Sequence, residues 1–173
     1  ASLVVARDEA ETGCFGPALA ALEATLPAFE ATGAVFWAQA CRLVLVPLWL
    51  NLGQPARAVP LLQPELEGLP AWLQADRLLL QLELARALRQ PLPALALQRV
   101  GPLAEADPHR KLALRVRALA HLPPEESVAQ ATPLAAELGR HERLGVVAAL
   151  HVHRGRSWLA LGRADEAAAD ALA

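Results

Sequence analysis

The sequence has no methionine and no tyrosine, and Lys111 is its only lysine. Aromatic residues make up 4% of the 173 positions and β-branched residues are comparatively few, so strand-forming residues are scarce. No spacing rule pairs the two cysteines, Cys14 and Cys41. We therefore expect both to be small, buried helix residues in a reducing compartment, with a disulfide as the alternative.

An excess of positive charge is also missing, since the formal net charge is −2 and the sequence pI is about 6.2. A chain without a basic field does not hold nucleic acid by counterion release, so we expect no direct nucleic-acid contact by this segment. The N-terminus lacks the pattern of a signal peptide, and the most apolar run, 43–50, is too short for a membrane span and contains Pro47. We expect a cytoplasmic protein that does not associate with membranes.

Hydrophobic residues make up 54% of the sequence and are mostly leucine, alanine and valine, a mixture that favours helix. Leu78, Leu82 and Ala85 recur at the three- and four-residue spacing of an amphipathic helix, and no alternating strand pattern is found. The chain is therefore predicted to be all-α. Pro47 lies inside an expected helix and should kink it, and Pro27 and Pro60 lie inside two other expected helices, where the same distortion is in question. The expected helices are 2–12, 16–31, 34–52, 55–67, 71–89, 93–105, 109–121, 124–138, 142–161 and 163–172.

An internal repeat runs through the sequence. Residues 49–53 read W-L-N-L-G with Ala58 five residues on, and residues 158–162 read W-L-A-L-G with Ala167 five residues on. The two copies lie 158 − 49 = 109 residues apart, about three units of 36. In each unit the glycine is expected to close a first helix, and the small alanine to allow a second helix to cross closely. The predicted marker alanines are Ala18, Ala58, Ala94, Ala129 and Ala167.

These units resemble tetratricopeptide (TPR) repeats, in which a large residue on the first helix precedes a glycine at the turn and an alanine at the close crossing. Trp49, Gly53 and Ala58 fill those places in the second unit, and Trp158, Gly162 and Ala167 fill them in the fifth. The third and fourth units depart from the pattern, with alanine (Ala85, Ala120) for the large residue and Arg89 or Pro123 near the turn. The resemblance implies a right-handed superhelical solenoid of about five antiparallel helix pairs.

The long, alanine- and arginine-rich units look more like the TPR-like domains of bacterial signalling ATPases and of LuxR-type transcription activators of the maltose-activator type. The segment 133–169 has this character. The resemblance implies a non-catalytic module that binds a protein, a peptide or a small effector ligand within a bacterial transcriptional regulator. The alternative is a scaffolding element whose exposed apolar surface mediates homo-oligomerisation.

Catalytic and metal-binding motifs are missing. His151 and His153 are the only metal-like cluster, but helix residues two apart point about 200° apart, and His141 is ten residues back. No nucleophile motif, P-loop or dinucleotide fingerprint is present, and carboxylate pairs such as Glu125–Glu126 are expected in first helix turns. We expect no metal, no cofactor and no enzyme activity.

The candidate binding residues are the polar side chains that the repeat register places on the inner wall of the solenoid. The units near Arg115 and Arg156 gather positive charge, so an acidic ligand is expected there. Val44 and Leu80 stand where peptide-carboxylate-binding TPR domains have asparagine, so that clamp is not expected here. An ordinary solvated helix face is the other interpretation. The predicted set is Arg42, Asn51, Asp76, Glu83, Arg86, Lys111, Arg115, His153 and Arg156.

The chain is expected to form one repeat domain over 1–173 and to be a fragment of a longer protein. It begins without methionine, and after Glu166 its only charge is Asp170. The last helix is therefore short and apolar, whereas a solenoid normally ends in an element with a polar outer face.

Overall fold

The computed structural model describes residues 3, 13–63, 68–92, 94–107, 110–138 and 144–172. Within these residues the chain is all-helical and contains no strand, so the all-α prediction is confirmed. The helices are α2 (Phe15–Ala31), α3 (Val35–Asn51), α4 (Pro55–Ala58), the 3₁₀ helix η1 (Val59–Leu62), α5 (Ala71–Ala87), α6 (Ala94–Glu105), α7 (Lys111–Leu119), α8 (Pro124–Leu138), α9 (Leu144–Ala160) and α10 (Ala164–Ala171).

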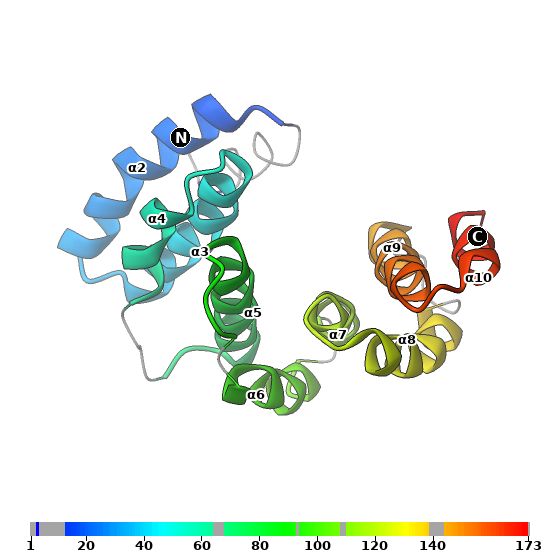
Figure 1. The fold of residues 1–173 in the computed structure, drawn as a ribbon. Helices are drawn as coiled ribbons and strands as arrows, with labels where there is room; N and C mark the ends of the chain where they lie inside the picture. Colours follow the sequence, from blue (N-terminus) through cyan, green and yellow to red (C-terminus); the bar gives the residue numbers. More distant parts are fainter. Residues whose placement is uncertain are drawn as a thin grey trace. The chain divides into compact units, whose positions relative to one another are not determined.

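The chain divides into two compact units, residues 1–93 and 94–173. In the first unit α3 is the central helix and contacts α2, α4, η1 and α5 (Figure 1). In the second unit α7 contacts α6, α8 and α9, and α9 contacts α8 and α10. Each unit thus contains helices that pack against the next helix along the chain and also against the one after it, as α3 does with α5 and α7 does with α9.

Each unit has its own apolar core. Between α2 and α3 the core is formed by Ala18, Leu22, Cys41, Leu45 and Leu48. The side of α3 that meets α4, η1 and α5 forms a second cluster of Val46, Trp49, Ala58, Leu62, Leu80 and Leu84. In the second unit, α7, α8 and α9 enclose Val116, Leu119, Ala131, Leu134, Leu138 and Leu150. Leucine, alanine and valine, which dominate the composition, therefore fill most of these interfaces.

The predicted helix boundaries agree with the structure within a few residues, with one clear exception. The expected helix at 55–67 is wrong: the α-helix ends at Ala58, and Val59–Leu62 is a 3₁₀ helix that contains Pro60. Proline has no N–H to donate, which disfavours continuation of the α-helical hydrogen bonds. Pro27 and Pro47 lie inside α2 and α3 without ending them. The predicted helix 2–12 (Leu3 apart) and residues 64–67 lie outside the described residues.

Glycine closes the helices where the repeat pattern predicts it. At the end of α3, the N–H of Gln54 donates to the carbonyl of Trp49 at 2.9 Å, and Gly53 has a φ of 67°. At the end of α9, the N–H of Arg163 donates to the carbonyl of Trp158 at 2.9 Å, and Gly162 has a φ of 74°. Both ends are Schellman motifs, in which the left-handed residue lets later N–H groups satisfy the last carbonyls.

The third unit forms the same turn without glycine. Arg89 takes a φ of 55°, and the N–H of Gln90 donates to the carbonyl of Ala85 at 2.8 Å. The fourth unit has a different turn, since the N–H of His121 donates to the carbonyl of Ala118 and the N–H of Leu122 to that of Leu119. These hydrogen bonds join residues three apart, as in a 3₁₀ helix, and tighten the end of α7 before Pro123.

The marker alanines are buried where the turns match. Ala18 and Ala58 are fully buried and Ala167 is 9% exposed, as predicted. Ala129 is exposed, so its assignment as a marker is wrong, and Ala131 is the buried alanine of α8. The three-residue turn after α7 shifts the buried position by two residues. The side chain of Ala94 lies outside the described residues.

The cysteines differ from each other. Cys41 is buried in α3 as expected, and burial raises the pKa of its thiol to about 11. The expectation of a buried helix residue is wrong for Cys14, which is exposed and precedes α2, and both cysteines are free. Among the described helices, none is long and apolar enough to cross a membrane.

Candidate partner-binding surfaces

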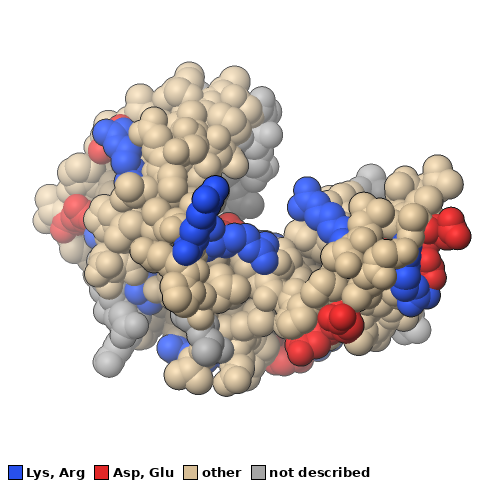
Figure 2. All heavy atoms as spheres, viewed as in Figure 1, with Lys and Arg blue, Asp and Glu red and all other residues tan. Residues whose placement is uncertain are grey.

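Charged side chains do not form an extended field on the face shown in Figure 2. Lysine and arginine atoms, like aspartate and glutamate atoms, form small separate groups there among a majority of uncharged atoms. Two exposed apolar surfaces, one in each unit, are the strongest candidates for binding a partner.

The first surface, here called the aromatic edge, consists of Phe29, Val35, Phe36, Trp37 and Trp72. It forms where α2 ends, α3 begins and α5 begins. The ring of Trp37 stacks on Phe29 at a centroid distance of 6.4 Å and meets the edge of Phe36 at 5.1 Å. Phe36 in turn meets Trp72 at 6.3 Å. Four of the seven aromatic residues in the chain are therefore joined in one cluster.

The aromatic edge remains open to solvent. Trp37 is 51% exposed, Val35 49% and Phe36 37%. Three consecutive residues of a helix span about 200° of its circumference, so they cannot all face one core. Contiguous exposed apolar patches on monomers mark interaction sites, and tryptophan is enriched at binding hot spots.

The second surface, here called the α9–α10 groove, is an open groove of about 600 Å³ in the second unit. Its lining is mostly apolar and includes two large apolar side chains that are exposed, Val152 at 49% and Leu159 at 61%. α10 lies against α9 at Gly155, where an added Cβ would be at ordinary contact distance, 3.8 Å, from the carbonyl oxygen of Ala167. The lining residues are Val147, Ala148, His151, Val152, Gly155, Arg156, Leu159, Ala167, Asp170 and Ala171.

A buried carboxylate holds α10 onto α9 beside this groove. The side chain of Asp170 is 5% exposed and accepts hydrogen bonds from Nε of Arg154 at 2.9 and 2.8 Å, and from a second Arg154 nitrogen. Nδ1 of His151 lies 3.2 Å from the same carboxylate. Hydrogen bonds from Arg154 hold the pKa of Asp170 below its ordinary value of 3.8, against the effect of burial, and His151 lowers it further. This ion pair is a structural contact between two helices.

Most of the predicted inner-wall residues already have partners. Arg42 donates to Glu30 at 2.5 Å, Nζ of Lys111 lies 2.7 Å from Glu105, and Arg115 lies 3.5 Å from Glu137. Four further members of the set also take part in polar or ring interactions. These four are Asp76, Glu83, Arg86 and His153.

Asn51 and Arg156 are the two members of the set that the structure leaves exposed without such a contact to the described residues. Arg156 lies in the α9–α10 groove, and Arg115 is not among the residues that line this groove. This groove therefore does not bring Arg115 and Arg156 together, and the acidic ligand expected near them stays a prediction.

The histidine pair was expected not to share a metal. His151 contacts Asp170 from α9, and His153 has a partner of its own. In the part of the chain that the structure describes, no group of three histidine, cysteine, aspartate or glutamate side chains is arranged to hold a metal ion. His141 lies outside the described residues.

Sequence reasoning missed the aromatic edge and the role of Asp170. The run 35–37 offered a signal, since three apolar residues in one helix turn exceed the face that a single core can cover. Asp170 offered no such signal, because its burial depends on Arg154 sixteen residues earlier.

Comparisons of the chain with protein-family models, with curated proteins and with solved structures find no match. The likeness to TPR repeats therefore depends on the residues and turns described above.

Proposed function

We propose that this chain is a non-catalytic helical repeat module that binds a protein or peptide partner. The observation that carries the proposal is the aromatic edge, where Phe36 and Trp37 are exposed in a chain that has only seven aromatic residues. Keeping a tryptophan half in water gives up the stabilisation that burying it would provide. Trp37 belongs to a cluster of four aromatic rings, and exposed aromatic side chains of this kind are enriched at binding hot spots.

We further propose that the helices are arranged as a right-handed solenoid of helix pairs. Two features favour it: the recurring Schellman turns, and the packing of α3 on α5 and of α7 on α9. A stack of this kind presents side chains from successive helices along one surface. The further proposal of a role in a bacterial transcriptional regulator is based on the sequence resemblance alone.

The test is a peptide-display selection against the immobilised chain. Selected peptides should bind the wild-type chain and bind at least tenfold more weakly when Trp37 is replaced, as in Trp37→Ser. Leu95→Glu is the matched control, since Leu95 is 69% exposed, lies in α6 and belongs to neither surface. Binding that survives Trp37→Ser unchanged would show that the aromatic edge is not the recognition site.

Self-association is a second candidate, and the same exposed side chains favour it. A second copy could bury Phe36 and Trp37 as readily as another protein. Light scattering separates the two: a monomer that binds selected peptides supports the module, whereas a stable dimer that Trp37→Ser dissociates supports self-association.

A further inference from the structure

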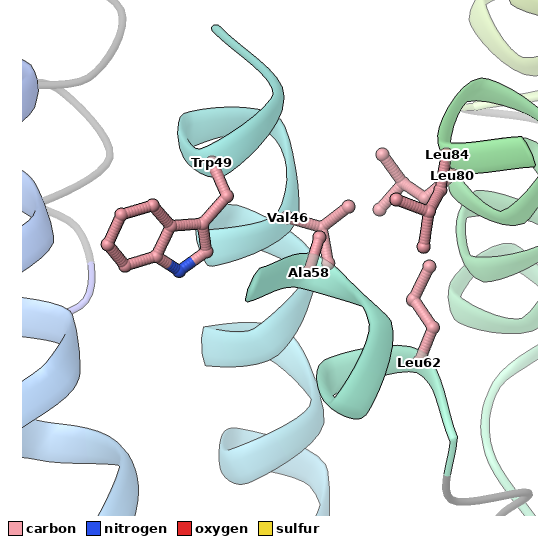
Figure 3. Packing of buried hydrophobic residues seen from close by; sticks show 6 residues of the cluster. All are labelled: Val46, Trp49, Ala58, Leu62, Leu80 and Leu84. Carbon is pink, nitrogen blue, oxygen red and sulfur yellow. The ribbon is translucent and has the colours of Figure 1, made fainter. Parts of the chain in front are cut away.

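The two copies of the internal repeat, residues 49–58 and 158–167, differ in whether a further helix covers the apolar surface of their helix pair. Adding 109 to a residue number in the first copy gives its equivalent in the second, so Leu50 corresponds to Leu159 and Ala58 to Ala167. In the first copy α5 covers this surface, with Leu80 and Leu84 packed in one cluster with Val46, Ala58 and Leu62. Figure 3 shows the two leucines of α5 directed at the side of α3 that carries Val46.

Five residues that belong to or pack against the cluster completed by α5 in the first copy have equivalents that line the α9–α10 groove in the second. The equivalent pairs are Leu43 and Val152, Val46 and Gly155, Leu50 and Leu159, Ala58 and Ala167, and Leu62 and Ala171. In the first copy Leu62 is 4% exposed and Leu50 is half-buried, whereas in the second Leu159 is 61% exposed. The groove is thus the counterpart of a helix-binding surface on which no described helix of this chain lies.

We propose that the α9–α10 groove binds an amphipathic helix of a partner protein, placed as α5 is placed on α3 and η1. Two large apolar side chains four residues apart, like Leu80 and Leu84, lie on one face of such a helix and fill the groove. Because Gly155 and Ala171 replace Val46 and Leu62, the groove has room for side chains at least as large as leucine.

Charge completes the description of the partner helix. Arg156 is exposed at the groove and makes no hydrogen bond or ion pair with the other described residues. A glutamate or aspartate on the partner helix, beside its apolar face, pairs with this arginine. The partner is therefore a helix with leucines at i and i+4 and with acidic flanking residues, a chemistry that α5 itself has through Asp76 and Glu83.

The proposal deepens the proposed binding function and depends on it. The probe is a fluorescein-labelled peptide with the sequence of α5, residues 71–87, titrated with the full chain and followed by fluorescence anisotropy. Saturable binding is expected, with at least a tenfold loss in Leu159→Glu or Val152→Glu and a several-fold loss in Arg156→Gln. All three side chains lie on the surface, so these variants are expected to fold, which circular dichroism checks.

Leu95→Glu is the matched control and should bind the peptide as the wild type does. A peptide with Leu80→Glu and Leu84→Glu should not bind. No binding by the α5 peptide, or binding unaffected by Leu159→Glu, would overturn the proposal. So would a dimer that Leu159→Glu dissociates, which would assign the groove to a second copy. A small apolar dye that binds at Leu159 while the peptide does not would assign it to a small molecule.

Failure of this inference is distinct from failure of the proposed function. If display-selected peptides lose affinity with Trp37→Ser but the α5 peptide does not bind, or binds Leu159→Glu as well as the wild type, the binding function stands and the groove is excluded. If neither variant weakens any peptide, both proposals fail.

Discussion

Two segments of this chain share the pattern W-L-x-L-G-x-x-x-x-A but have different surroundings. At residues 49–58 the pattern joins α3 to α4, and the resulting surface is covered by α5. At residues 158–167 it joins α9 to α10, and the equivalent surface is the open α9–α10 groove. The local geometry is the same, with Gly53 and Gly162 both in the left-handed region. The pattern therefore specifies a helix turn and a close crossing, and the neighbouring helix decides what the surface does.

The sharpest contrast between the two copies should come from truncating the leucines at each surface. Leu80 is 2% exposed between α3 and α5, so Leu80→Ala should destabilise the chain by about 3 kcal/mol through lost burial and a residual cavity. Leu159 is 61% exposed, so Leu159→Ala should change stability by less than about 0.5 kcal/mol. Urea denaturation followed by circular dichroism measures both. Equal losses would mean that the α9–α10 groove is covered in solution.

Enlarging the alanines at the close crossings should separate the copies less strongly. Ala58 is fully buried under α5, so Ala58→Leu should destabilise by about 2 kcal/mol through overpacking. Ala167 is 9% exposed and borders the groove, so Ala167→Leu has space nearby and should destabilise by about 1 kcal/mol. Chemical denaturation compares the two variants, and a neutral result for Ala58→Leu would show that the repeat register is misassigned.

The second copy has an ion pair where the first has an apolar contact, since Asp170 corresponds to Leu61. Asp170→Asn leaves Arg154 without its counter-charge and should destabilise by about 1–2 kcal/mol at pH 7. Because the pKa of Asp170 is lowered in the folded state, this stabilisation is complete above its ordinary value of 3.8 and is lost as the pH falls through the lower, folded-state pKa. Unfolding free energies at pH 7 and pH 3 check this, and a gap between the variant and the wild type that does not narrow at pH 3 would contradict it.

The smallest expected effects concern the turns. Gly162→Ala should destabilise by about 1 kcal/mol, because alanine is strained at a φ of 74°. Arg89 already takes a φ of 55° without being glycine, so Arg89→Gly should stabilise by about 0.5 kcal/mol. Thermal denaturation of the two variants should therefore shift the melting temperature in opposite directions. Shifts in the same direction would show that the turn geometry does not set these energies.

Much of the local structure could be read from the sequence because its causes are local. Helix periodicity identified α5 and α9, and the glycines at 53 and 162 marked helix ends. The prediction of a helix at 55–67 was wrong: the apolar pattern continues past Pro60, but a proline lacks the N–H that an α-helix needs there, and the chain forms a 3₁₀ helix instead. The assignment of Ala129 was wrong because α7 ends in hydrogen bonds between residues three apart, unlike the Schellman turns after α3 and α9.

The candidate sites were less predictable because they depend on distant residues. The polar inner-wall residues were chosen by repeat register, but Arg42 and Lys111 form ion pairs with Glu30 and Glu105 on neighbouring segments. The aromatic edge brings together rings from three helices, and Trp72 joins Phe36 from 36 positions along the chain.

The sequence by itself determined that this chain is helical and where many of its helices end, since both follow from hydrogen bonds and side-chain spacing within a few residues. Only the tertiary structure decided which apolar faces are covered. Leu50 and Leu159 occupy the same place in the same pattern, yet one is half-buried and packed against a core cluster and the other is 61% exposed. The physical reason is that burial depends on the helix that packs from outside the pattern, and residues 49–58 and 158–167 contain nothing that specifies it.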